Sequence, residues 1–238
     1  MNIQGHNSPS QVDQRLALMQ LSDSFFPSGS FTLSHGLESL IQSKHICSIQ
    51  DLEDFLGLIF HNKVGSMDMV ALRQAYRTSA GHHTLTLQDI DAQLFAQTLI
   101  KPNRDSQCKS GRALLMVARQ TWHHPQLDTI YQSIQVREMH GMHSVIFAVV
   151  GQAIGLDEDN TVFAFLHNFL TGLCGAALRL GLIGHINAQT LLKNMAPSLE
   201  CVARGAIATE LDDMWSCTPF LDIAQLTHDA LPQKLFST

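Results

Sequence analysis

The sequence has few charged residues, and its acidic residues outnumber its basic ones. Of its 238 residues, 15% are Asp, Glu, Lys or Arg, and 15 basic against 21 acidic side chains give a formal charge of −6. A groove for nucleic acid needs clustered Lys and Arg, so we expect no nucleic-acid partner. Ordinary globular domains hold roughly 25% charged residues, so an unusually large share of this surface is neutral. Contacts with protein partners or with further copies of the chain are therefore expected.

Short motifs of several enzyme classes are also absent. The sequence contains no Gly-x-x-x-x-Gly-Lys-Ser/Thr run, no Gly-x-Ser-x-Gly elbow and no His-Glu-x-x-His pair. The run Pro27-Ser28-Gly29-Ser30 is superficially like a nucleophile loop, but no β-branched strand precedes it. We interpret this run as a turn. The absences predict a chain without catalytic activity of its own.

Cysteine is scarce and unpaired in the sequence. The five cysteines are widely spaced and include no Cys-x-x-Cys pair: Cys47, Cys108, Cys174, Cys201 and Cys217. This usage predicts reduced, mostly buried thiols in a cytoplasmic protein. Residues 1–11 are polar and do not form a secretory signal. The apolar stretch 161–184 is interrupted by His167, Asn168 and Arg179, so we expect a packed helix there and no membrane span.

Apolar residues recur mainly at helical spacing. Ser48 and Asp51 have the spacing of a capping box, and an apolar face follows that predicts a helix to about Val64. Lys101-Pro102-Asn103 is expected to end another helix. The remaining predicted helices cover residues 12–21, 34–42, 66–79, 87–100, 110–123, 126–138, 143–154, 161–180, 188–194 and 197–214. The pattern predicts an all-α, single-domain bundle of about ten helices.

The domain organisation follows from composition. The sequence has no internal repeat and no long linker, so residues 12–216 are predicted to form one helical domain. Residues 1–11 are too polar to fold alone, and residues 217–238 carry only sparse apolar side chains. We expect both ends to be mobile, with 217–238 acting as a tail that a partner orders.

Thirteen histidines raise the question of a metal site, because imidazole is a good ligand for nickel and zinc. His82 and His83 are adjacent, as are His123 and His124, and adjacent residues cannot share one helical face. His140 and His143 lie on either side of a predicted helix break. No resident metal or cofactor is predicted, while transient contact with a metal ion remains open.

Two charged residues each allow two interpretations. Arg179 follows an apolar run just before Gly181, where a helix C-terminus would stabilise a cation and where an acidic partner group could also bind. Glu38 follows a turn, where a carboxylate favours a helix N-terminus or could serve as a surface contact. Periodicity does not separate these alternatives.

Three ordered segments resemble a known family. The first is residues 16–38, whose matching positions are Pro27, Gly29, Phe31, Ser34, His35, Gly36, Leu37 and Glu38. The second is the run Ala176-Ala177-Leu178-Arg179-Leu180-Gly181, and the third is the tail from Pro219 to Ala224 with His228, Leu235 and Phe236. Together they resemble the UreF family of urease accessory proteins.

The resemblance implies a helical scaffold that forms a homodimer and binds UreD (also called UreH), the GTPase UreG and apo-urease. It implies GTP-dependent nickel insertion, with Ni²⁺ passing transiently through an internal passage and with no membrane involved. Glu38 and Arg179 become candidates for surface contact with the GTPase or for gating. The candidates for docking on UreD are His228, Lys234, Leu235 and Phe236.

The sequence departs from the family pattern at four positions. Ser28 replaces a small apolar residue, Thr227 and Lys234 replace arginines, and Pro232 replaces an aromatic residue. These changes put a bidentate ion pair in the tail in doubt. Two other functions stay open: a nickel metallochaperone that stores Ni²⁺ on its histidines, and a GTPase-activating regulator that uses Arg179 as an arginine finger.

Overall fold

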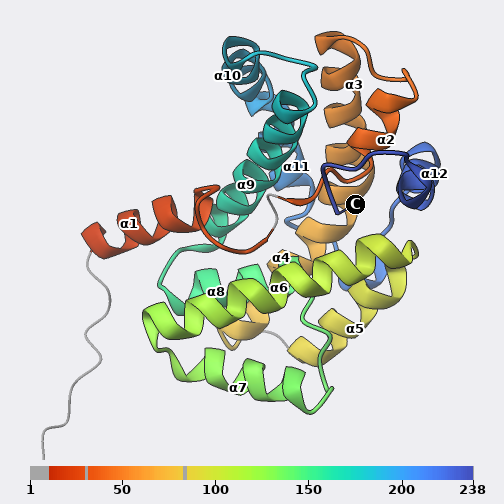
Figure 1. The fold of residues 1–238 in the computed structure, drawn as a ribbon. Coiled ribbons are helices and arrows are strands. Elements are labelled where there is room, and N and C mark those ends of the chain that lie inside the picture. Colours follow the sequence, from red (N-terminus) through yellow and green to blue (C-terminus); the bar gives the residue numbers. More distant parts are fainter. Residues whose placement is uncertain (1–10, 30–31, 83–84, 238) are drawn as a thin grey trace, which may run out of the picture.

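The computed structural model describes residues 11–29, 32–82 and 85–237, and this part of the chain is helical and contains no strand (Figure 1). The prediction of an all-α fold is confirmed. The helices, in chain order, are α1 (Gln11–Ser22), α2 (Leu37–Gln42), α3 (Ile49–Ile59), α4 (Met69–Ser79), α5 (Leu87–Gln97), α6 (Lys101–Trp122), α7 (Pro125–Gln135), α8 (His143–Ala153), α9 (Glu158–Arg179), α10 (His185–Asn194), α11 (Ala196–Gly205) and α12 (Pro219–Thr227). The segment 1–11 expected to be flexible lies outside the described residues except for Gln11.

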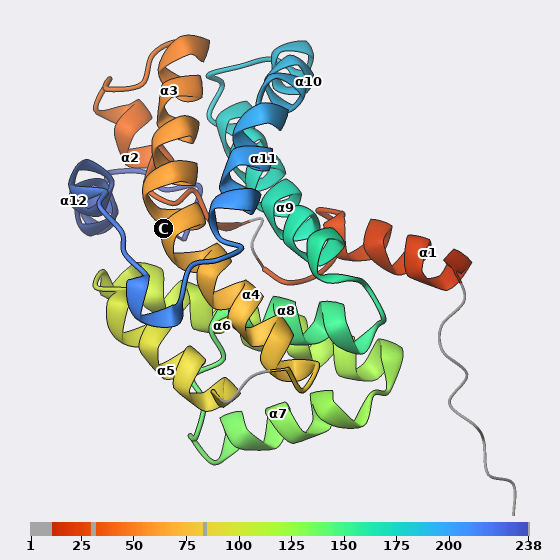
Figure 2. The ribbon, with the colours of Figure 1, turned by 180° about the vertical axis from the view of Figure 1, so that it is seen from behind.

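Helix α8 is the centre of the core. Every residue from His143 to Gly151 is buried, as expected for a helix that is apolar on all sides. It packs between α6 on one side and α4 on the other, as the two opposite views show (Figures 1 and 2). This arrangement holds the remaining helices around one continuous hydrophobic core.

The capping box predicted at Ser48 is confirmed. The Ser48 hydroxyl accepts a hydrogen bond from the backbone N–H of Asp51, and the Asp51 carboxylate accepts one from the N–H of Ser48. The break predicted near Gly65 is wrong. A π-helical stretch, Phe60–Asp68, joins α3 and α4 into one continuous helix. Gly65 lies close to Val202 of α11, so the missing side chain permits helix packing.

The role predicted for Lys101-Pro102-Asn103 is also wrong. This run begins α6, with Pro102 in the first turn, so the predicted start at Ser110 is nine residues too late. Proline suits that place because the first turn of a helix needs no backbone N–H donor. The preceding helix, α5, ends at Gln97.

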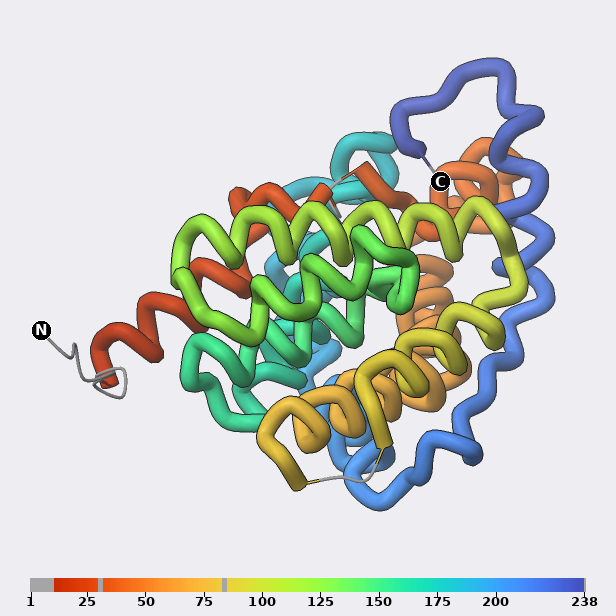
Figure 3. Tube along the Cα trace, turned by 90° about the horizontal axis from the view of Figure 1, so that it is seen from below, coloured from red at the N-terminus to blue at the C-terminus, as the bar shows by residue number. Residues whose placement is uncertain are grey.

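The C-terminal part differs most from expectation. Helix α11 ends at Gly205, well before the predicted limit at Met214. The tail, expected to be mobile, contains α12 and a short 3₁₀ turn over His228–Ala230, and it packs against α2. Figure 3 shows this blue segment running along one edge of the molecule before the chain end returns beside α2 and α6.

Helix α9 is the only described helix long and apolar enough to cross a membrane. It carries the stretch that the sequence analysis assigned to a packed helix. Slightly more than half of its most apolar window, 56%, is buried inside the molecule. It contacts α1, α2, α4, α8, α10 and α11, as a core helix does.

Candidate functional site

Glu38 lies at the start of α2, directly after a tight turn. Gly36 has φ 88° and His35 has φ 51°, so the chain turns through two left-handed residues before the helix begins. A β-carbon at Gly36 would lie 2.8 Å from Leu221 Cδ1, so glycine also permits the close approach of α12. The turn directs the Glu38 side chain inward, where it is 0% exposed.

The Glu38 carboxylate binds three donors from the C-terminal tail. Oε2 lies 2.8 Å from Nε2 of His228 and accepts the backbone N–H of Phe236 at 3.3 Å. Oε1 accepts the backbone N–H of Leu235 at 2.7 Å. A buried carboxylate is costly without such partners, and hydrogen bonds to a charged group are strong. Glu38 therefore holds the tail against α2 through residues about 190 positions away.

Arg179 closes the other side of this site. Its guanidinium carbon lies 4.2 Å above the centre of the buried Phe236 ring, a cation–π geometry. Nε also donates to the carbonyl of Gly175 at 3.1 Å, one turn back at the end of α9. Desolvation lowers the pKa of Arg179 from its usual value. The structure thus supports the helix-terminus interpretation of Arg179, and the residue is also exposed to solvent.

The predicted site residues fall into two groups. Glu38, Arg179, His228 and Phe236 converge in one site, while Leu235 is 68% exposed beside it. Of the two alternatives left open for Glu38, a surface contact does not fit this structure, because the tail covers the carboxylate. Lys234 points away and pairs with Asp229, with Nζ 3.0 Å from Oδ1.

The motif residues around Glu38 are likewise divided. Pro27 and Gly29 are exposed in a loop where Gly29 has φ 77°, which agrees with the turn interpretation of this run. Phe31 lies outside the described residues. Ser34 and Leu37 are fully buried, and the Ser34 hydroxyl accepts the N–H of Glu38 at 3.4 Å.

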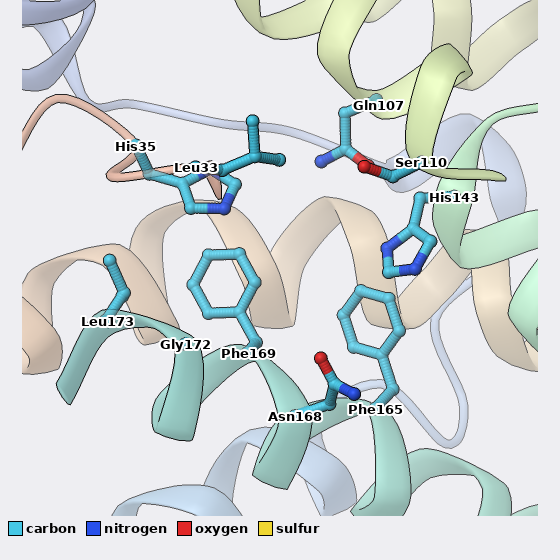
Figure 4. Close-up of a pocket in the computed structure, with 10 residues that line it drawn as sticks. All are labelled: Leu33, His35, Gln107, Ser110, His143, Phe165, Asn168, Phe169, Gly172 and Leu173. Atoms are coloured by element: carbon cyan, nitrogen blue, oxygen red, sulfur yellow. The ribbon is translucent and has the colours of Figure 1, made fainter. Parts of the chain in front are cut away.

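His35 and His143 line an internal cavity of about 20 Å³ (Figure 4). The His35 ring packs on Phe169 with centroids 4.6 Å apart, and His143 packs on Phe165 at 5.4 Å. Burial lowers the pKa of His35 to about 3, assisted by the positive charge of Lys63, and burial lowers that of His143 to about 4. Both imidazoles are therefore neutral at pH 7.

Two buried ionisable residues lie in the π-helical stretch, and the sequence analysis did not find them. Lys63 is 6% exposed and Asp68 is 2% exposed. Burial lowers the pKa of Lys63, against the effect of Asp68, and burial raises the pKa of Asp68 to about 6, against the effect of Lys63. Both residues are buried within this π-helical stretch, which the helical spacing of the sequence did not predict.

Two of the histidines considered as metal ligands have other contacts. His140 stacks on Phe95 with centroids 3.6 Å apart, and the His124 side chain accepts the N–H of Gln126 at the start of α7. His83 lies outside the described residues. Within 11–29, 32–82 and 85–237, no three His, Cys, Asp or Glu side chains group around a possible metal position.

The cysteines are free thiols. Their expected burial is correct only for two of them, Cys108 and Cys174. The exposed ones are Cys47, Cys201 and Cys217. Because they lie on different elements of the fold, their burial could not be predicted from composition.

Helix α12 presents an apolar face to solvent beside the Glu38 site. Phe220, Ile223 and Leu226 are 49%, 60% and 57% exposed, and Leu235, later in the tail, is 68% exposed. The opposite face of α12 buries Leu221, Ala224 and Gln225. A helix that is apolar on both faces is expected where a second surface binds it.

Comparisons with known proteins agree with the resemblance seen in the sequence. The UreF family model matches residues 46–196. The chain is 48% identical over 228 residues to the urease accessory protein UreF of Trichodesmium erythraeum (strain IMS101), covering 96% of this chain and 98% of that protein. It is 30% identical over 226 residues to UreF of Geobacillus kaustophilus (strain HTA426), covering 94% and 99%.

A third relative, UreF of Corynebacterium glutamicum (strain R), is 25% identical over 225 residues, covering 94% of this chain and 98% of that protein. Each of these alignments covers at least 94% of this chain. The chain belongs to the UreF family of urease accessory proteins.

Proposed function

We propose that this chain is a non-catalytic scaffold for nickel insertion, which bridges UreD and the GTPase UreG on apo-urease. One observation carries the proposal: the tail is packed against α2 and bound by Glu38, while Phe220, Ile223 and Leu226 of α12 and Leu235 of the same tail stay exposed. A preordered surface loses less conformational entropy on binding than a mobile tail. The α12 face and Leu235 form what we term the tail surface, and we assign it to UreD.

The proposed place of UreG is the opposite side of the Glu38 site, where Arg179 is exposed at the end of α9. A guanidinium there can bind a partner carboxylate, and its contact with Phe236 would link that contact to the tail. We also propose a homodimer in the cytoplasm, because the neutral surface and the exposed apolar residues of α1 favour self-association.

Nickel is the cargo of this scaffold, and we propose that the chain holds no resident metal or cofactor. Any ligand on the path must release Ni²⁺, so weak transient contacts suit the role. A histidine store is the less favoured alternative, because His228, His140 and His124 are already engaged with protein groups. Tight binding of one Ni²⁺ per chain in a titration of the isolated protein would favour the store.

Co-expression with tagged UreD tests the scaffold directly. The full chain should co-purify with UreD, and a chain ending at Thr227 should keep its helical circular dichroism but lose UreD. The shortened chain lacks His228, Leu235 and Phe236, so Glu38 loses every tail donor. Undiminished co-purification of the shortened chain would refute the tail assignment.

The substitution Arg179→Ala distinguishes a GTPase-activating role of Arg179 from a role in binding UreG. An arginine finger contributes about 10³-fold or more to GTP turnover, so its removal would abolish stimulation while UreG still bound. We expect the variant to lose UreG binding instead, because Arg179 is already packed on Phe236 and bonded to Gly175. GTP turnover and UreG retention are measured on the same purified complex.

A further inference from the structure

A groove runs between α12 and the corner that joins α2 to α3. It consists of two adjoining hollows of about 350 Å³ and 250 Å³ that share Leu40, His45 and Phe220. His45 and Phe220 touch edge to face with centroids 5.1 Å apart, and both rings line both hollows. The groove therefore consists of two connected hollows that border the tail surface at Phe220.

The first hollow is mainly apolar with one unused polar group at its wall. Its apolar lining includes Ile223 and Leu231. Ser39 also lines it, is 4% exposed, and its hydroxyl has no hydrogen-bond partner in the described structure. Because this hydroxyl is itself buried, the apolar side chains dominate the surface that an occupant of the first hollow would meet.

The second hollow has an apolar wall and an acidic rim. Phe55 and Leu58 form part of the wall, and Asp51 and Asp54 lie along one edge. Asp51 accepts the backbone N–H groups of Cys47 and Ser48 at 2.9 Å, and these hydrogen bonds lower its pKa. Asp51 is therefore ionised at neutral pH, and the rim attracts positive charge.

We infer that this groove binds a short segment of a partner protein that carries two apolar anchors followed by Lys or Arg. One anchor fills each hollow, and the cation lies against Asp51 and Asp54. The inference rests on the proposed function in treating α12 as part of a docking surface, and it adds the chemistry of the segment that docks there.

A phage-displayed library of random 12-residue peptides, selected on the full chain, tests the groove without UreD. Enriched peptides should share two apolar residues and a nearby Lys or Arg. Thr227→Trp, which places an indole over the first hollow, should weaken their binding at least tenfold. Asp54→Lys at the rim should weaken basic peptides similarly and favour peptides with Glu in place of Lys or Arg.

Ile186→Trp is the matched control, because Ile186 is 83% exposed on α10 and does not line the groove. Circular dichroism of each variant verifies folding. Absence of enriched peptides, or enriched peptides that bind equally to Thr227→Trp and Asp54→Lys, would overturn the inference. A dimer that Thr227→Trp dissociates would assign the groove to a second copy and would also overturn it. Failure of UreD to co-purify refutes only the proposed function.

Discussion

Glu38 and Asp91 are single buried carboxylates that each bind an irregular segment of the described chain. Glu38 gathers the tail, and Asp91 does the same for the α7–α8 connection by accepting the backbone N–H groups of His140, Gly141 and Met142. Both carboxylates are 0% exposed. Desolvation raises the pKa of Asp91 although its three N–H donors favour the charged form. At both places one side chain fixes a segment that has no regular backbone pairing.

Replacing Glu38 by Gln should release the tail. The amide keeps one acceptor oxygen but turns an NH₂ group toward N–H donors. The free energy that holds the tail against α2 should therefore fall by about 2 kcal/mol or more. Hydrogen exchange of the amides at 234–237 should accelerate at least tenfold while α8 stays protected. Asp229→Asn, at the exposed partner of Lys234, is the control and should leave exchange unchanged. Unchanged protection in Glu38→Gln would contradict the role of Glu38.

Acid should destabilise the fold through the two cavity histidines. Their folded pKa values, about 3 for His35 and about 4 for His143, lie below the ordinary value of 6.5. The folded state therefore binds fewer protons, and the stability present above pH 6.5 is lost as pH falls toward 4. Each histidine contributes a slope of up to about 1.4 kcal/mol per pH unit. Asp68, with its pKa raised to about 6, opposes part of this loss below pH 6.

Urea unfolding of His143→Gln between pH 7 and pH 5 measures this effect. Between pH 7 and pH 5 the free energy of unfolding should fall less in the variant than in the parent chain. The difference should be at most that of one titrating histidine, about 1.4 kcal/mol per pH unit. His185→Gln, at an exposed position on α10, should follow the parent chain. Parallel pH profiles for parent and His143→Gln would disprove the buried neutral state of His143.

At the scale of elements, glycine decides how closely helices pack. A β-carbon at Gly111 of α6 would lie 2.1 Å from the carbonyl oxygen of Gly141, whereas one at Gly175 of α9 would meet nothing within 4 Å. The sequence does not predict this difference, because both glycines lie inside helical patterns. The two positions differ only in whether another element packs against them, and local spacing does not report that contact.

The pair of substitutions Gly111→Ala and Gly175→Ala tests this difference. Gly111→Ala should destabilise by about 3 kcal/mol or more, because a backbone carbonyl must move. Gly175→Ala should stabilise by about 0.5–1 kcal/mol through helix propensity. Thermal unfolding compares the two proteins with the parent. Equal effects of the two substitutions would show that Gly111 of α6 packs less closely against Gly141 than described.

Helix class could be predicted from sequence far better than helix limits. The apolar faces predicted α3 and α8, and the Ser48 capping box fixed a boundary, because both signals are local. The π-helical stretch Phe60–Asp68 was not predicted, and the start of α6 at Lys101 was missed because Pro102, which suits a first turn, was interpreted as a helix end. The short helix α12 was missed because its nine residues give too little periodicity.

At the scale of the whole molecule, the fold brings distant parts of the sequence into one site. The family resemblance pointed to Glu38, Arg179, His228 and Phe236, and these residues lie together. Residue spacing alone could not reveal that the Glu38 carboxylate is buried beneath the tail. The resulting architecture is a helical domain whose C-terminal segment is held by hydrogen bonds to Glu38.

Reconstitution of urease activation tests the scaffold most directly. Purified apo-urease, UreD, UreG, GTP and Ni²⁺ are mixed with the parent chain or with Glu38→Ala, and urease activity is measured over time. The account predicts activation that requires the parent chain in stoichiometric amount and falls at least tenfold with Glu38→Ala. Full activation without the chain, or equal activation by Glu38→Ala, would contradict it.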